Sequence, residues 1–264
     1  MFKISIAGCT GRMGQRVLRE AHLASDIDIV GALTRPQNPF VGQAIEALVT
    51  DIPGGPVITD DPRQAFQDAD VVVDFSAPEA IETHRTTALD LLKPFLVCVT
   101  GLSDAQKESL EKAAAYIPVM IAPNTSVGIA LLRKLAREAA TFLGPAYDVS
   151  ILEMHHRYKK DAPSGTSLSI GKELAKVEHL QHNLPPYPCC SPRPQGTIES
   201  VALRGGGVAG DHSVIFAGEE DLIEITHRAL NPNLFAQGAL KAAVWLCGQK
   251  PGLYTIDDML EGSD

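Results

Sequence analysis

The sequence predicts an α/β protein in which a doubly wound parallel sheet is followed by an α+β unit with one open sheet. Two patterns support this prediction. Up to about residue 145, short apolar segments alternate with segments of helical spacing, as in parallel strands joined by crossover helices. After that point, longer segments of alternating apolar and polar residues follow one another with little helix between them, which is typical of an α+β unit.

In the first half, the predicted strands are 4–7, 28–33, 71–74, 95–99 and 119–122, and the predicted helices are 11–24, 61–69, 78–90, 103–115 and 128–143. Two of these helix starts carry a specific signal. Asp61 precedes Pro62, and an Asp N-cap followed by Pro favours a helix start. Ser103 and Gln106 form the pattern of a capping box.

In the second part, the predicted strands are 148–154, 198–203, 213–217 and 222–227, and the predicted helices are 167–177 and 235–246. The stretch 180–196 is rich in Pro and polar residues and is predicted to be a surface loop.

The composition excludes several classes of partner. The 264 residues carry a formal net charge of −9, so nucleic acid and anionic membranes are not expected as partners. No apolar run approaches the ~18 residues of a spanning helix. The chain enters a strand pattern without a signal peptide, so we expect a cytoplasmic protein.

The five cysteines of the chain match no metal spacing and are expected to be reduced. A strained disulfide between Cys189 and Cys190 is the alternative.

Gly8, Gly11 and Gly14 stand between the first predicted strand and the first helix. Glycines at this point let the backbone turn sharply and approach a pyrophosphate, which the free N–H groups of the helix start then bind. The strand-turn-helix context predicts a dinucleotide-binding turn. The alternative is a plain tight turn.

The second strand ends in Leu33-Thr34-Arg35. A carboxylate at this position would bind the ribose 2′-hydroxyl of NAD, and none is present. Arg35 could pair with a 2′-phosphate and Thr34 could donate a hydrogen bond to it, so we predict NADPH as the preferred cofactor, with NADH possible. A solvated arginine is the alternative. Further strand ends, at 74–78, 98–101 and 122–126, offer small and hydroxyl residues beside which a nicotinamide ring and ribose could lie.

Residues 153–166, EMHHRYKKDAPSGT, concentrate positive charge in an acidic chain. Ser164, Gly165 and Thr166 are predicted to open a helix whose N–H groups could bind a carboxylate. His155 is the natural proton donor or acceptor there, and Lys159 and His156 add charge and donors. A solvated basic loop is the alternative. A zinc site is disfavoured, because neighbouring histidines on a strand point to opposite faces and no third ligand is near in sequence.

The same residues, with others along nearly the whole chain, resemble the 4-hydroxy-tetrahydrodipicolinate reductases (dihydrodipicolinate reductases) of lysine and diaminopimelate synthesis. The matching segments are AGCTGRMG at 7–14, DFSAPE at 74–79, APNTSVG at 122–128, EMHHRYKKDAPSGT at 153–166, GTIESVALRGGGVAGDH at 196–212, ITHRA at 225–229 and FAQGA at 235–239.

The resemblance implies a Rossmann-like dinucleotide-binding domain, 1–125 with 236–264, and an inserted substrate-binding and oligomerisation domain, 126–235, with a mixed open sheet. It implies a homotetramer acting on a cyclic imine with two carboxylates. His155 would be the acid/base residue and Lys159 the second catalytic residue, and no metal is expected. The implied substrate residues are His156, Gly165 and Thr166, to which the predicted helix start adds Ser164. The implied cofactor residues are Gly8, Cys9, Thr10, Gly11, Arg12, Met13, Arg35, Cys98, Val99, Thr100, Ala122, Pro123, Asn124 and Thr125, to which the position beside Arg35 adds Thr34.

Three departures from the family pattern bear on the cofactor. Typical members have Gly-Thr-Thr-Gly at 98–101, where this chain has Cys-Val-Thr-Gly, so contacts there must be mostly through the backbone. Many dual-specificity members have Glu in place of Thr34, which strengthens the NADPH prediction. An arginine that some members carry shortly before Phe235 is replaced in Leu230-Asn231-Pro232-Asn233.

Two rival functions remain open. A dehydrogenase of another amino-acid pathway, such as an aspartate or homoserine dehydrogenase, would not be expected to carry HHRYKKDAPSGT. A non-catalytic NADP-sensing protein would need His155 or Lys159 to be lost, and both are present.

Overall fold

The computed structural model describes residues 1–182 and 192–261. These fall into two compact units, one formed by Met1–Ser126 with Asn233–Asp264 and the other by Val127–Pro232. Cys189 and Cys190, for which a disulfide was the alternative to reduced thiols, lie outside the described residues. No helix in the described part of the chain is both long and apolar enough to cross a membrane.

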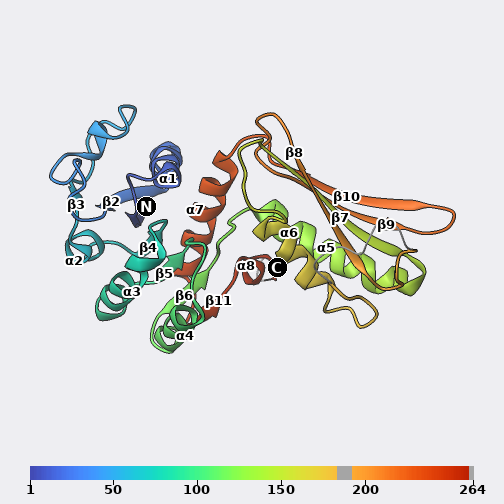
Figure 1. The fold of residues 1–264 in the computed structure, drawn as a ribbon. Coiled ribbons are helices and arrows are strands. Elements are labelled where there is room, and N and C mark those ends of the chain that lie inside the picture. The colour runs from blue at the N-terminus through green and yellow to red at the C-terminus, as the bar shows by residue number, and fades with distance from the viewer. Residues whose placement is uncertain (183–191, 262–264) are drawn as a thin grey trace. The chain divides into compact units, whose positions relative to one another are not determined.

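The first unit contains one parallel sheet with strand order β11-β6-β5-β4-β1-β2-β3 (Figure 1). Its strands are β1 (Phe2–Ala7), β2 (Ile27–Leu33), β3 (Ile58–Thr59), β4 (Val71–Asp74), β5 (Phe95–Val97), β6 (Pro118–Ile121) and β11 (Gly252–Tyr254). Its helices are α1 (Arg12–Leu23), α2 (Pro62–Phe66), α3 (Ile81–Asp90), α4 (Asp104–Ala113), α7 (Asn233–Cys247) and α8 (Ile256–Glu261). The predicted doubly wound parallel sheet is therefore confirmed.

Both predicted helix-start signals are present in this unit. The Asp61 side chain accepts a hydrogen bond from the N–H of Arg63 at 2.9 Å. Ser103 and Gln106 exchange the two bonds of a capping box. β3, β11 and α8 were not predicted, because two- to six-residue elements are too short for a periodic pattern. The helix predicted at 61–69 is shorter, and that at 78–90 starts as a 3₁₀ turn.

The last helix of this unit, α7, returns the chain to the first helix, and Figure 1 shows the red α7 beside the blue α1. Asn233 accepts a hydrogen bond from Arg16 at 2.6 Å and donates one to Glu20 at 2.7 Å. A Cβ on Gly238 would lie 1.8 Å from the carbonyl oxygen of Thr125, so the α7 backbone packs directly on the end of the APNTS segment. The C-terminal segment thereby supports two of the predicted cofactor segments.

The second unit is a mixed sheet covered on one face by two helices. Its elements are α5 (Val127–Leu143), β7 (Asp148–His155), α6 (Gly165–Leu174), β8 (Ile198–Arg204), β9 (Asp211–Ala217) and β10 (Leu222–Arg228). The strand order is β10-β9-β7-β8, with β7 and β8 parallel and the other pairs antiparallel. Alternate residues of β7 are buried, and Val149 and Ile151 pack with Ile170 and Leu174 of α6.

The helix predicted at 167–177 is wrong at both ends. It begins at Gly165, because Ser164 is the N-cap and its hydroxyl accepts the N–H of Ser167 at 3.1 Å. It ends at Leu174. The described part of the predicted 180–196 loop is tied at its ends, where the N–H of Gln181 donates to the carbonyl of Gly196 at 2.8 Å.

Candidate active site

The turn between β1 and α1 requires glycine for close backbone contact. Gly8 has a φ of +75°, and a Cβ there would lie 2.7 Å from the backbone of Phe75 and Ser76. A Cβ on Gly14 would lie 2.2 Å from the carbonyl oxygen of Gly8. A larger side chain at either position would force the backbone to move. The dinucleotide turn read from the sequence therefore has the compact geometry that such a turn needs.

The start of α1 is open to an anion. Its N-cap, Gly11, makes no side-chain hydrogen bond to the first turn, so the orphan N–H groups of that turn have no side-chain cap. Arg12 and Arg35 are both exposed. Thr34 is instead buried, and its hydroxyl lies 2.8 Å from that of Thr10. The charged side chain that the end of β2 presents to solvent is therefore that of Arg35.

In the DFSAPE segment, Asp74 forms a buried pair with His84 next to the glycine turn. Asp74 is fully buried at the end of β4, and its Oδ2 lies 2.7 Å from Nδ1 of His84. Its Oδ1 accepts the N–H of Ser76 at 2.8 Å. The carboxylate thereby holds the 75–76 turn in the position where it meets Gly8.

The segments after β5 and β6 present mostly backbone. Cys98 and Val99 are buried, whereas Thr100 is exposed. Burial, together with the negative charge of Asp74, raises the pKa of the Cys98 thiol well above its ordinary value, which makes this thiol inert rather than reactive.

In the next segment, Ala122 and Thr125 are buried, Asn124 is half-buried and Pro123 is exposed. Asn124 accepts the N–H of Ser126 at 2.9 Å. Thr125 donates its hydroxyl to the carbonyl of Phe235 at 2.6 Å.

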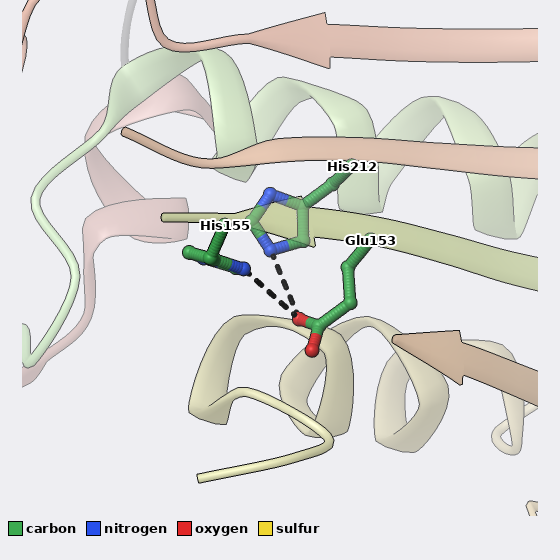
Figure 2. Close-up of side chains that lie close together, drawn as sticks. All are labelled: Glu153, His155 and His212. Carbon is green, nitrogen blue, oxygen red and sulfur yellow. Dashed lines mark ion pairs between the residues drawn. The ribbon is translucent and has the colours of Figure 1, made fainter. Parts of the chain in front are cut away.

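In the second unit, three buried polar side chains meet at the end of β7. Glu153 and His155 lie two residues apart and therefore on the same face of the strand, and His212 of β9 stands directly opposite Glu153 in the strand register. Figure 2 shows the carboxylate of Glu153 directed at both rings. Its Oε2 lies 3.7 Å from Nδ1 of His155 and 3.6 Å from Nε2 of His212.

The other carboxylate oxygen of Glu153 anchors the basic segment. Oε1 accepts the N–H of Ser164 at 3.0 Å and a hydrogen bond from Arg204 at 3.3 Å. Arg204 ends β8, where it is paired with His155 in the register, and it also donates to the carbonyl of Asp161. The start of α6 is therefore fixed to β7 through one buried carboxylate.

The protonation of this cluster is strongly biased. Burial alone would raise the pKa of Glu153, but the nearby His212, the hydrogen bond from Ser164 and the nearby His155 outweigh it and lower this pKa to about 2. For His155, burial is the largest effect and lowers the pKa to about 4. Glu153 opposes this shift, while His212, Lys159 and Arg204 add to it. Glu153 is thus ionised and His155 neutral at pH 7.

A glycine segment encloses His155. The N–H of Gly205 donates to the carbonyl of His155 at 2.9 Å, and the carbonyl of Gly206 accepts the N–H of Arg157 at 3.2 Å. A Cβ on Gly210 would lie 3.1 Å from Nε2 of the His155 ring. The RGGGVAGDH segment therefore belongs to the surroundings of the candidate acid/base residue.

The remaining members of the basic segment separate by exposure. Lys159 is half-buried and its Nζ lies 2.9 Å from Oδ2 of Asp161, an ion pair that lowers the pKa of Asp161. His156 is half-buried, whereas Arg157 and Lys160 are exposed. Five basic residues that are equivalent in the sequence therefore lie in different surroundings.

At the start of α6, Gly165 is exposed and Thr166 is half-buried. The hydroxyl of Ser164, by contrast, is 2% exposed and engaged as the helix cap, 3.3 Å from Nε2 of His212. A ligand at this helix start would meet Gly165 and Thr166 before Ser164.

Glu153, His155 and His212 could in principle face a common metal ion, since their ligand atoms lie within 4.8 Å of one another. This third ligand was invisible in the sequence, because His212 arrives from another strand. Arg204, however, already places a positive charge on the same carboxylate, which disfavours a divalent cation. The cluster is better suited to holding a proton on one of the two histidines beside Glu153 than to holding a metal ion.

The sequence assigns no role to His212 or Arg204. The two-residue spacing of Glu153 and His155 on a strand could have placed them together. No sequence signal indicates that Arg204 and His212 flank them, because that depends on the order of β8, β7 and β9 in the sheet.

The first unit fits a bound dinucleotide, because its glycine turn, open helix start and exposed arginines match what a pyrophosphate and a ribose phosphate require. The fold and this turn define a dinucleotide-binding protein. Sequence models of the dihydrodipicolinate reductase N-terminus and C-terminus match residues 2–125 and 128–260. The chain belongs to the dihydrodipicolinate reductase family.

Individual relatives agree with this assignment. The chain is 40% identical over 263 residues to the 4-hydroxy-tetrahydrodipicolinate reductase of Zymomonas mobilis, covering 98% of this chain and 96% of that one. It is 39% identical to the enzyme of the same name from Rubrobacter xylanophilus, covering both chains fully. The fold is shared with a dipicolinate-bound dihydrodipicolinate reductase from a Paenisporosarcina species, with a TM-score of 0.78, 23% identity and coverage of 98% and 99%.

Proposed function

We propose that this protein reduces 4-hydroxy-tetrahydrodipicolinate to tetrahydrodipicolinate in lysine and diaminopimelate biosynthesis, with hydride from a reduced pyridine nucleotide. The observation that carries the proposal is the segment 153–166, in which a buried histidine, a half-buried lysine and a helix start lie together. Relatives at about 40% identity over the full length bear this name.

The two units divide the binding of the reactants. The first unit holds the nucleotide through the turn 8–13, through Arg35, and through the segments 98–100 and 122–125. Cys98 and Val99 contribute their backbone, because their side chains are buried. The second unit holds the substrate, whose two carboxylates require cations and N–H donors. Lys159, His156 and the start of α6 at Gly165 and Thr166 provide them.

The reaction adds a hydride and a proton to the substrate and releases water. When bound, the reduced nicotinamide supplies the hydride. The chain must then stabilise the negative charge that develops on the substrate ring and supply the proton. Lys159 provides the fixed positive charge and His155 donates the proton. Because the pKa of free His155 is lowered to about 4, it becomes a donor only when the bound dicarboxylate raises that pKa.

The decisive experiment follows NADPH absorbance while a dihydrodipicolinate synthase generates the unstable substrate. Oxidation of NADPH that depends on both proteins supports the proposal. Absence of turnover with either NADPH or NADH contradicts it. Oxidation with homoserine-pathway substrates instead would indicate a different dehydrogenase.

NADPH is the cofactor that this chain should prefer, because Arg35 is exposed at the end of β2 and no carboxylate accompanies it. Replacing Arg35 by Ala should raise KM for NADPH about 10–100-fold, the worth of a charge-assisted hydrogen bond, and should change KM for NADH little. Arg19→Ala, an exposed arginine of α1, is the matched control and should leave both values unchanged. A wild-type protein that clearly prefers NADH would contradict the assignment.

A cytoplasmic location stays a prediction.

A homotetramer is the assembly that the second unit supports. The sheet face opposite α5 and α6 carries apolar side chains in register, with Leu152 beside Val201 and Met154 beside Leu203. Val201 and Leu203 are 42% and 46% exposed, and such a stripe is typical of a covered face. Light scattering should give four times the chain mass, and Leu203→Glu should lower it. Leu23→Glu, on exposed α1 surface, should not.

A further inference from the structure

Glu153 is placed so that two imidazoles depend on one oxygen atom. Its Oε1 already accepts the N–H of Ser164 and a hydrogen bond from Arg204. Its Oε2 is buried and has no hydrogen-bond partner among the described residues. His155 and His212 approach that oxygen at nearly equal distances, 3.7 and 3.6 Å, and from different strands.

All three residues are more than nine-tenths buried, with exposures of 1% for Glu153, 8% for His155 and 4% for His212. Water therefore provides little alternative solvation for a proton on either ring. The rings meet edge to face, with centroids 5.1 Å apart, so both cannot carry a positive charge without strong repulsion. The geometry allows one imidazolium against one carboxylate.

We propose that Glu153 is the positioning residue that allows His155 to hold its catalytic proton, and that His212 competes with His155 for the same carboxylate. This inference rests on the proposed function, in which His155 is the proton donor. It adds two residues to which no role has been assigned.

The charges around His155 act in opposite directions. Glu153 favours the charged ring, and His212, Lys159 and Arg204 disfavour it. Asp161 offsets part of the effect of Lys159, to which it is paired at 2.9 Å.

On the far side of His212 lies His227 of β10, directly opposite in register. Burial and the nearby His212 lower the pKa of His227, while Asp211 opposes this shift. His227 is therefore neutral at pH 7 and leaves the balance among Glu153, His155 and His212 unchanged.

The consequence is a proton affinity that substrate binding can switch. In the free protein burial, together with the positive groups, outweighs Glu153, and His155 is neutral. A bound dicarboxylate neutralises Lys159 and adds negative charge, so that Glu153 then suffices to hold a proton on His155. His155 is therefore charged mainly in the complex, where the proton is needed.

The first test uses no turnover. Histidine side-chain NMR would follow the titration of His155 in the free protein and with dipicolinate, a planar dicarboxylate, as the probe. Glu153→Gln should lower the pKa of His155 by one unit or more, the usual effect of a contacting opposite charge. His212→Gln should raise it. Glu173→Gln removes a carboxylate of α6 that is paired with Arg137 of α5, and it should leave the pKa of His155 unchanged.

Arg204→Gln provides a result if a variant with a buried substitution fails to fold. The Arg204 side chain is 21% exposed, and its loss should raise the pKa of His155, as His212→Gln does. Shifts of the same sign for Glu153→Gln and His212→Gln, or no shift for any of the three variants, would overturn the proposal.

The second test measures kcat against pH with the reductase assay. Because the protonated ring is the donor, kcat should fall as pH rises through the pKa of the complex. Glu153→Gln should move this fall to lower pH by about one unit or more, and Arg204→Gln should move it to higher pH. A structural role alone would lower kcat at every pH without moving the limb. Absence of any turnover would sink the proposed function, whereas the NMR titration would still decide the inference.

Discussion

Replacing His155 by Gln should lower kcat about 10²–10⁴-fold, the range expected when a general acid is lost. Glutamine keeps a polar side chain in the buried position beside Glu153 but cannot transfer a proton. KM for the substrate should change much less, because the ring is placed to donate a proton rather than to bind a carboxylate. The measurement is steady-state reduction at saturating NADPH, with the substrate generated in the assay.

His182→Gln is the matched control for this variant. His182 is a half-buried histidine of the same unit, with its ring 3.3 Å from the hydroxyl of Ser200, and its pKa is also lowered by burial. It should keep near-normal kcat. If His155→Gln retained near-full kcat while folded, His155 would not be the donor.

Replacing Lys159 by Ala should lower kcat about 10²-fold and raise KM about tenfold. The ammonium group is expected both to bind a substrate carboxylate, worth about 1.5–3 kcal/mol, and to stabilise the charge that develops in the transition state. Loss of Lys159 also leaves Asp161 without its 2.9 Å ion pair. The uncompensated carboxylate would then repel the substrate, which adds to the rise in KM.

Lys160→Ala is the matched control for Lys159, since it removes the same charge from an exposed neighbouring position. Both kinetic constants should be unchanged in it. Equal losses in the two lysine variants would mean that the segment acts through its total charge. An unchanged Lys159→Ala variant would remove Lys159 from the machinery altogether.

The two variants together separate two properties of the segment 153–166. His155 is buried at the end of β7 and held by its surroundings, whereas Lys159 lies beyond the strand and is partly exposed. A proton donor benefits from burial because its pKa can be tuned there. A carboxylate-binding lysine benefits from exposure because its charge costs little to maintain in water.

Much of the fold could be predicted from local patterns. The parallel sheet follows from the alternation of apolar strands with helical segments, and the starts of α2 and α4 follow from side-chain caps at Asp61 and Ser103. Those signals are local, because a cap bonds to residues two or three positions away. The shortest strands escaped prediction, since β3 has only two residues and owes its pairing to β2.

Part of the candidate site could likewise be predicted from local patterns, and part could not. The sequence by itself determined the glycine turn, the basic segment and the residues 164–166 that open a helix, since each is contiguous. Only the tertiary structure decided that Thr34 faces Thr10 and leaves Arg35 as the exposed charge. The tertiary structure also brings Glu153, His155 and His212 together in one buried cluster. That meeting depends on the register of β7 with β9, and a register is set by packing across the whole sheet rather than by any local spacing.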